Sequence, residues 1–152
     1  MLQRIQTIYF LLATACVLCM YAFDFALIDV VKEQYIFNSS GITVNEKNVT
    51  NLPYQVVIAL LAVYTTGVML LYKKRPLQLK LGRLNYLLHL FLIVMMFFGV
   101  DDAAEATGLK DAAVIKYGIG FYLPIAALPF LFLANRAIKR DEEIVKSLDR
   151  LR

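Results

Sequence analysis

Four long apolar segments, separated by polar ones, constrain this chain more than any other feature. They cover residues 5–23, 54–72, 84–100 and 114–134. A helix rises about 1.5 Å per residue, so about 20 apolar residues cover the ~30 Å hydrocarbon core of a bilayer. Hydrophobic residues make up 60% of the chain and charged residues 18%, against about 45–50% and about 25% in soluble domains. We therefore predict an all-α integral membrane protein, a single domain over residues 1–152 built as a four-transmembrane-helix bundle.

The first apolar segment has a second interpretation, as a cleaved signal peptide. Arg4 precedes it, as in the basic region of such peptides, and Ala13-Thr14-Ala15 resembles a cleavage site. Apolar residues continue through Phe23, well past that site. This continuation favours a span that is retained.

The longest polar segment, residues 24–53, contains strand-forming and turn-forming residues. Val, Ile, Tyr and Phe are frequent in residues 30–37, Asn38-Ser39-Ser40-Gly41 favours a turn, and Ile42-Thr43-Val44 favours a second strand. An isolated hairpin is only marginally stable in water. We therefore expect a small extracytoplasmic β-hairpin that packs on the helices.

Charged residues divide unequally between the two sides that four spans would create. The N-terminus, a connector over residues 73–83 and a tail over residues 135–152 together carry twelve Lys and Arg against four Asp and Glu. The segments on the other side, mainly the outer loops 24–53 and 101–113, carry four basic and eight acidic residues. Cytoplasmic loops are enriched in Lys and Arg, so we expect both termini to be cytoplasmic.

The basic connector and tail are the candidate contact surfaces. Each basic residue near an anionic membrane surface contributes about 1 kcal/mol. The tail also has a narrow apolar stripe on an otherwise charged helix, which predicts a cytosolic amphipathic C-terminal helix that lies on the interface or docks in a partner's groove. A tail that only fixes the topology is the alternative. The candidate lipid or partner contacts are Lys73, Lys74, Arg75, Lys80, Arg83, Arg136, Lys139, Arg140, Arg150 and Arg152.

Four polar residues form a candidate intramembrane cluster: Thr65, Thr66, Asn85 and His89. Ionisable groups inside a bilayer are candidates for function. A proton relay needs a second titratable partner, and none of the four predicted spans has an acidic residue in its interior. We expect a neutral His89 that is hydrogen-bonded to a threonine or to Asn85.

Cys16 and Cys19 form a CxxC pair whose thiols share one helix face. The arrangement is similar to that of four-span thiol–quinone enzymes of the vitamin K epoxide reductase type, which use a second, external cysteine pair. This chain has no further cysteine, and one histidine with two cysteines has no transition-metal spacing. We expect packing roles for both cysteines, and no catalytic residue, cofactor or metal.

Three stretches of the sequence resemble a known family. They are MLQRIQTIYFLLA (residues 1–13), LQLKLGRLNYLL (77–88) and LFLANRAIKRDEEIVKSLDRLR (131–152). They resemble a family of small bacterial four-span inner-membrane proteins known only as a domain of unknown function. The likeness covers essentially the whole chain and is most specific over residues 133–152. It implies a bacterial cytoplasmic membrane, and no activity or site residue.

Together these observations predict a non-enzymatic multi-pass inner-membrane protein, a subunit or scaffold. Its expected partners are anionic lipid headgroups and a membrane or cytosolic protein, with a second copy of the chain as a further candidate and no nucleic acid. One alternative is a thiol–quinone redox enzyme that uses Cys16 and Cys19. Another is a small oligomeric transporter in which His89 and the Pro124–Pro129 break line a path.

Overall fold

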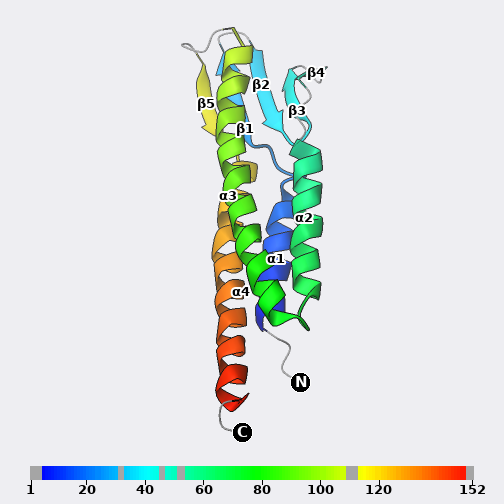
Figure 1. Ribbon diagram of the computed structural model, residues 1–152. Helices are drawn as coiled ribbons and strands as arrows, with labels where there is room; N and C mark the ends of the chain where they lie inside the picture. Colours follow the sequence, from blue (N-terminus) through cyan, green and yellow to red (C-terminus); the bar gives the residue numbers. More distant parts are fainter. Residues whose placement is uncertain (1–4, 31–32, 45–46, 51–53, 109–112, 150–152) are drawn as a thin grey trace.

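The computed structural model describes residues 5–30, 33–44, 47–50, 54–108 and 113–149. Within these residues, helices α1 to α4 run side by side and strands β1 to β5 form a sheet at one end of the bundle (Figure 1). α1 begins and α4 ends at the end away from the sheet. The helices are α1 (Ile5–Cys19), α2 (Tyr54–Leu70), α3 (Arg75–Ala106) and α4 (Ile119–Asp149).

Only two of the described helices are long and apolar enough to cross a membrane. These are α3, with 32 residues, and α4, with 31. At about 1.5 Å per residue, the 15 residues of α1 and the 17 of α2 extend only ~23 and ~26 Å, short of the ~30 Å hydrocarbon core. The lengths of α3 and α4 indicate association with a membrane.

The predicted all-α bundle of four spans is therefore wrong. α1 ends at Cys19 in a tighter turn, in which the amides of Met20, Tyr21 and Ala22 each donate to a carbonyl three residues earlier. The segment predicted as the fourth span divides into a strand and the helix α4, and α4 continues without a break into the predicted tail as far as Asp149. The predicted third span is likewise the middle of α3, which begins at Arg75.

The predicted outer hairpin is part of a larger antiparallel sheet. Its strands are β1 (Ala26–Val30), β2 (Glu33–Asn38), β3 (Gly41–Val44), β4 (Lys47–Thr50) and β5 (Val114–Tyr117), in the order β4-β3-β2-β1-β5. β2 and β3 are joined at the predicted turn, where Asn38 Oδ1 accepts from the Ser40 amide at 2.9 Å. β5 lies between α3 and α4 in the chain and pairs with β1, so the sheet joins two segments far apart in sequence.

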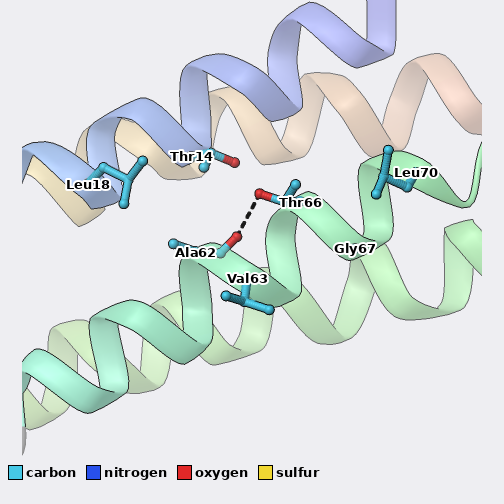
Figure 2. Close-up of a pocket in the computed structure, with 7 residues that line it drawn as sticks. All are labelled: Thr14, Leu18, Ala62, Val63, Thr66, Gly67 and Leu70. Carbon is cyan, nitrogen blue, oxygen red and sulfur yellow. Dashed lines mark hydrogen bonds between the residues drawn. The ribbon is translucent and has the colours of Figure 1, made fainter.

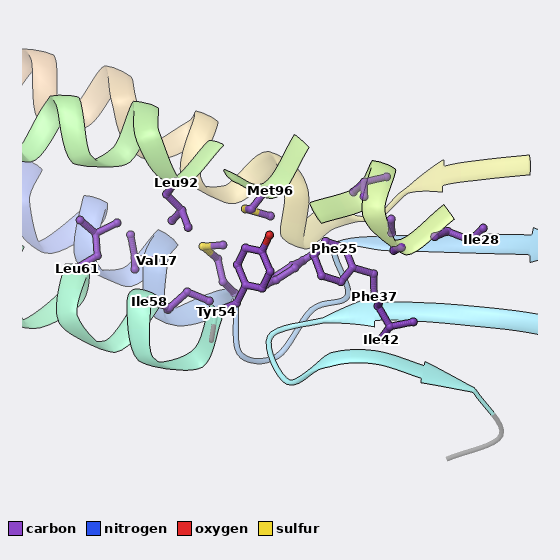
Figure 3. Close-up of a cluster of buried hydrophobic side chains, with 14 of the residues drawn as sticks. Val17, Phe25, Ile28, Phe37, Ile42, Tyr54, Ile58, Leu61, Leu92 and Met96 are labelled. Atoms are coloured by element: carbon purple, nitrogen blue, oxygen red, sulfur yellow. The ribbon is translucent and has the colours of Figure 1, made fainter. Parts of the chain in front are cut away.

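Three aromatic rings fasten the sheet to the helices (Figure 3). Phe25, Phe37 of β2 and Tyr54 of α2 are all buried, and their ring centroids lie 5.3 to 6.1 Å apart in edge-to-face pairs. The Tyr54 hydroxyl donates to the Met95 carbonyl of α3 at 2.8 Å. The ring can approach α3 because residue 99 is glycine: a Cβ there would lie 2.1 Å from the Tyr54 hydroxyl oxygen. Such aromatic pairs contribute about 0.5–1.5 kcal/mol each beyond their burial.

The start of α4 also depends on a close backbone contact. The Gly118 amide donates to the Phe25 carbonyl at 2.8 Å, and the Gly120 amide to the Asp24 carbonyl at 3.0 Å. A Cβ at Gly118 would lie 2.3 Å from the Asp24 carbonyl oxygen, so only glycine fits this crossing. The segment that follows α1 is thereby fixed against the beginning of α4.

Small residues let α1 and α4 pack closely in the half of the bundle away from the sheet. A buried cluster there joins Phe10 and Ala13 of α1 to Ala127, Leu131 and Ala134 of α4, and small residues at helix contacts are typical of membrane proteins. All four helices also expose large apolar side chains. An apolar surface of this extent requires lipid or protein to cover it. Its exposed members include Leu11, Leu60, Val63, Phe91, Phe97, Phe98 and Phe132.

Replacing Gly99 by alanine should destabilise the protein by about 1–3 kcal/mol, because the added methyl group displaces the Tyr54 ring. Gly67 of α2 is the matched control, since a Cβ at that position meets no atom within 4 Å. Gly67→Ala should leave the free energy of unfolding unchanged or raise it by up to about 1 kcal/mol. Reversible unfolding in mixed micelles measures the free energy of unfolding of both variants. Equal losses in Gly99→Ala and Gly67→Ala would contradict the role of Gly99.

The ion pair between β1 and β5 should make the edge of the sheet sensitive to acid. Lys116 Nζ lies 2.8 Å from Asp29 Oδ2, and Gln34 of β2 donates to Asp29 Oδ1 at 2.8 Å. The hydrogen bonds from Lys116 and then Gln34 hold the pKa of Asp29 below its usual value. Because the folded pKa is the lower one, the stabilisation is complete above the usual pKa of about 3.9. It is lost as the pH falls through the folded value.

Acidification below about pH 4 should therefore lower the protection of the Val114–Tyr117 amides of the native protein, measured as their hydrogen exchange relative to the intrinsic rate at each pH. In Asp29→Asn this additional acid sensitivity should be absent, since residue 29 no longer titrates. The amides of β3 serve as an internal reference. The same acid response in the variant would show that another group controls this edge.

Candidate functional site

The structure brings most of the predicted basic residues to one end of the bundle, opposite the sheet. Lys73 and Lys74 precede α3, whereas Arg75, Lys80 and Arg83 lie on it, so most of the predicted connector is helical. Arg136, Lys139 and Arg140 lie on α4, and Arg75 Nη1 donates to the Asp141 carbonyl of that helix at 3.4 Å. The connector and the tail thus form one surface. Arg150 and Arg152 lie outside the described residues.

A groove of about 640 Å³ lies between α1 and α4 at this basic end. Apolar side chains form most of its wall, and Arg136 and Arg140 stand one helical turn apart along it. Neither arginine forms an ion pair within the described part of the chain, whereas the neighbouring Lys139 pairs with Glu143 at 3.8 Å. The groove therefore combines mostly apolar walls with two guanidinium groups that form no ion pair in the described part of the chain, and with the acidic Asp141. Its lining residues are Ile5, Tyr9, Leu133, Arg136, Ala137, Arg140, Asp141 and Ile144.

Three of the four predicted intramembrane polar residues lie together inside the bundle. Thr65, Asn85 and His89 are fully buried. The Thr65 hydroxyl lies within hydrogen-bonding distance of the Leu61 carbonyl, at 2.8 Å, and of Asn85 Oδ1, at 3.1 Å. His89 Nδ1 lies 2.9 Å from the Asn85 backbone carbonyl.

Thr66 lies on a different side of α2 from Thr65 and lines a groove of about 430 Å³ between α1 and α2 (Figure 2). Its hydroxyl donates to the Ala62 carbonyl at 2.9 Å, and Thr14, across the groove, donates in the same way to Phe10. Both hydroxyl protons are therefore used within their own helices. The remaining lining is mainly apolar, so this groove offers a surface for packing and little chemistry.

Sequence reasoning missed three further polar residues of the bundle, of which Gln78 and Gln6 are buried and Asn135 is half-buried. Gln78 donates to the Val68 carbonyl at 3.0 Å, Asn135 of α4 donates to the Gly82 carbonyl at 3.0 Å, and Gln6 of α1 is only 2% exposed. Gln78 shares one face of α3 with Asn85 and His89. The spacing is visible in the sequence, but it is informative only once α3 is known to begin at Arg75 rather than near residue 84.

The cysteine pair lies near the sheet end of α1, with Cys16 half-buried and Cys19 exposed, and both thiols are free. Among the described residues, no group of three or more His, Cys, Asp or Glu is placed to hold a metal ion. The pair therefore has no neighbouring metal-ligating cluster in this part of the chain.

Replacing Thr65 by valine should lower the free energy of unfolding, because it removes the contact between α2 and the Asn85 side chain. Interhelical hydrogen bonds in membrane proteins contribute about 0.6 kcal/mol on average and up to about 1.7 kcal/mol. Thr66→Val is the matched control, since that hydroxyl bonds only within its own helix. Unfolding in mixed micelles should show the loss for residue 65 alone; an equal loss at residue 66 would contradict it.

The chain was compared with known protein families and with curated proteins. No curated protein matches it. The family model described as a domain of unknown function, DUF4293, matches residues 2–151, which is nearly the whole chain. The chain therefore belongs to the DUF4293 family.

Proposed function

We propose that this protein is a non-enzymatic multi-pass protein of the bacterial cytoplasmic membrane that binds anionic phospholipid at its basic end. In this proposal α3 and α4 cross the bilayer, α1 and α2 pack alongside them, and both termini are cytoplasmic. The sheet then lies on the outer side. The protein acts as a membrane subunit or scaffold, and the bound lipid anchors its cytoplasmic end.

The distribution of charge supports this orientation. The basic end holds the exposed Lys73, Lys74, Arg136 and Arg140, as the positive-inside rule requires for a cytoplasmic face. The sheet end instead carries acidic residues. Exposed aromatic side chains lie near that end of the helices, where aromatic rings favour the headgroup level. They include Tyr21, Phe23, Tyr117 and Tyr122.

The groove between α1 and α4 is the observation that carries the lipid proposal. Its apolar wall residues Ile5 and Leu133 are exposed and belong to the apolar outer surface of the bundle, so an acyl chain could continue from the bilayer into the groove. Arg136 and Arg140 stand where the headgroup would lie. A guanidinium binds phosphate through two parallel hydrogen bonds, and basic pockets between helices at the cytoplasmic side are a recurring form of lipid site.

The contribution of the two arginines can be stated as a ratio. Each basic residue near an anionic surface contributes about 1 kcal/mol, so the pair contributes about 2 kcal/mol. This corresponds to a roughly 30-fold preference for an anionic lipid. A protein partner could use both the charges and the apolar wall; lipid is favoured because that wall is continuous with the apolar outer surface of the bundle.

The double variant Arg136→Gln/Arg140→Gln should lose about 30-fold in affinity for phosphatidylglycerol. Binding is measured by native mass spectrometry after transfer from nanodiscs of phosphatidylglycerol and phosphatidylcholine. The native protein should retain phosphatidylglycerol in preference to phosphatidylcholine.

The control is Lys73→Gln/Lys74→Gln, which removes the same charge at the same end but outside the groove. It should keep most of the affinity. Equal losses in the two double variants would show diffuse attraction to the surface and no defined site. If the native protein retained phosphatidylcholine as well as phosphatidylglycerol, the proposal would be overturned.

A further inference from the structure

The buried face of α3 changes character halfway along the helix. From the basic end, its buried residues are first Gln78, Gly82, Asn85 and His89, and none of these side chains is aliphatic. The next buried residues along this face, toward the sheet, are apolar: Leu92, Met96 and Val100. Eleven residues separate Gln78 from His89, which is about 16 Å along the helix. We call this stretch of α3, together with Thr65 and Asn135 from the neighbouring helices, the polar seam.

The polar seam contains several buried hydrogen-bonding atoms that have no partner among the described residues. One buried amide donor, Asn85 Nδ2, has no partner among them. The same holds for three buried acceptor positions, Gln78 Oε1, Asn135 Oδ1 and His89 Nε2. Each unsatisfied buried group costs about 1–3 kcal/mol, and buried water typically removes this cost by making about 3 hydrogen bonds.

The hydrogen bonding of His89 fixes the state of its ring. A carbonyl oxygen can only accept, so the 2.9 Å contact with the Asn85 carbonyl places a proton on Nδ1. In the neutral ring Nε2 then carries a lone pair and no proton. This nitrogen is the buried atom that lacks a donor, and water is able to supply one.

The two ends of the polar seam differ in their access to solvent. Gln78 lies one helical turn from Lys74, which is exposed. On the other side of His89, the side chains of Leu92, Met96, Ile58 and Leu61 are packed together below the sheet (Figure 3). Solvent is therefore close at the basic end, and apolar packing closes the sheet end.

From this arrangement we propose that the polar seam holds a file of water molecules that connects His89 to solvent at the basic end and lets its Nε2 exchange protons with that solvent. A hydronium ion entering the file breaks one O–H bond and leaves water behind, while the Nε2–H bond forms. The imidazolium keeps its Nδ1–H bonded to the Asn85 carbonyl. This inference does not depend on the lipid groove.

No titratable side chain around His89 can carry a proton to its ring, so water is the remaining route. The titratable residues of α1 and α2 are Tyr9, Cys16, Cys19, Tyr54 and Tyr64, and α4 adds Tyr122 before Arg136. The hydroxyls of Tyr54 and Tyr64 donate to the Met95 and Leu81 carbonyls of α3. Neither α1 nor α2 carries Asp, Glu, Lys or Arg, and apart from His89 itself residues 84–100 of α3 and 119–135 of α4 carry no acidic or basic residue. No carboxylate on these segments can relay a proton to the ring.

The chain contains one histidine, so a single ¹⁵N-labelled imidazole can be observed in the full-length protein in lipid nanodiscs. Nitrogen chemical shifts should report the Nδ1–H tautomer. Magnetisation transfer from water should reach Nε2. A ring in the Nε2–H form, or an Nε2 that receives no magnetisation from water, would overturn the proposal without any variant.

Two substitutions on the same face of α3 then locate the route. Gln78→Leu places an apolar side chain at the basic end of the seam, and the transfer from water to Nε2 should be lost. Met96→Leu changes an apolar residue on the sheet side of His89, and the transfer should be retained. Transfer that survives Gln78→Leu, or that is lost equally in both variants while both stay folded, would contradict access from the basic end.

Discussion

The contact of Tyr54 with α3 is the interaction on which the rest of the structure depends. The sheet is small, and it can persist only where its apolar face is covered. Phe25 and Phe37 supply that face, and the Tyr54 ring joins them to the helices through its edge contacts and its hydrogen bond to Met95. Because Gly99 has no side chain, the ring reaches the α3 backbone itself. The top of the bundle and the base of the sheet therefore share one core.

The interior of the bundle differs between its two ends. Near the sheet the buried faces are aromatic and aliphatic, and their packing fixes the position of every strand that contacts them. Toward the basic end the buried face of α3 carries amides and an imidazole, while α1 and α4 approach through alanines. One half of the molecule thus has rigid apolar packing. The other half has polar groups in its interior and arginines on its surface, and both proposed activities belong to it.

The sequence predicts the chemistry of the segments better than their shape. Apolarity marks where the helices lie, and the positions of Thr65, Asn85 and His89 are enough to anticipate that they could meet. Hydropathy does not distinguish the short strand Val114–Tyr117 from the start of a helix, since apolar residues surround its one charged residue, Lys116. The strand forms because it pairs with β1, where Leu27 lies opposite Lys116, 89 positions further along the chain.

The pairing of β5 with β1 has a consequence for the order of assembly. Until residues 114–117 have been synthesised, β1 is an edge strand whose outer amides and carbonyls have no neighbour, and unpaired edges invite association with other chains. The strand that covers this edge emerges only after all of α3. The sheet is therefore completed late, and α3 must be in place before the first strands are protected.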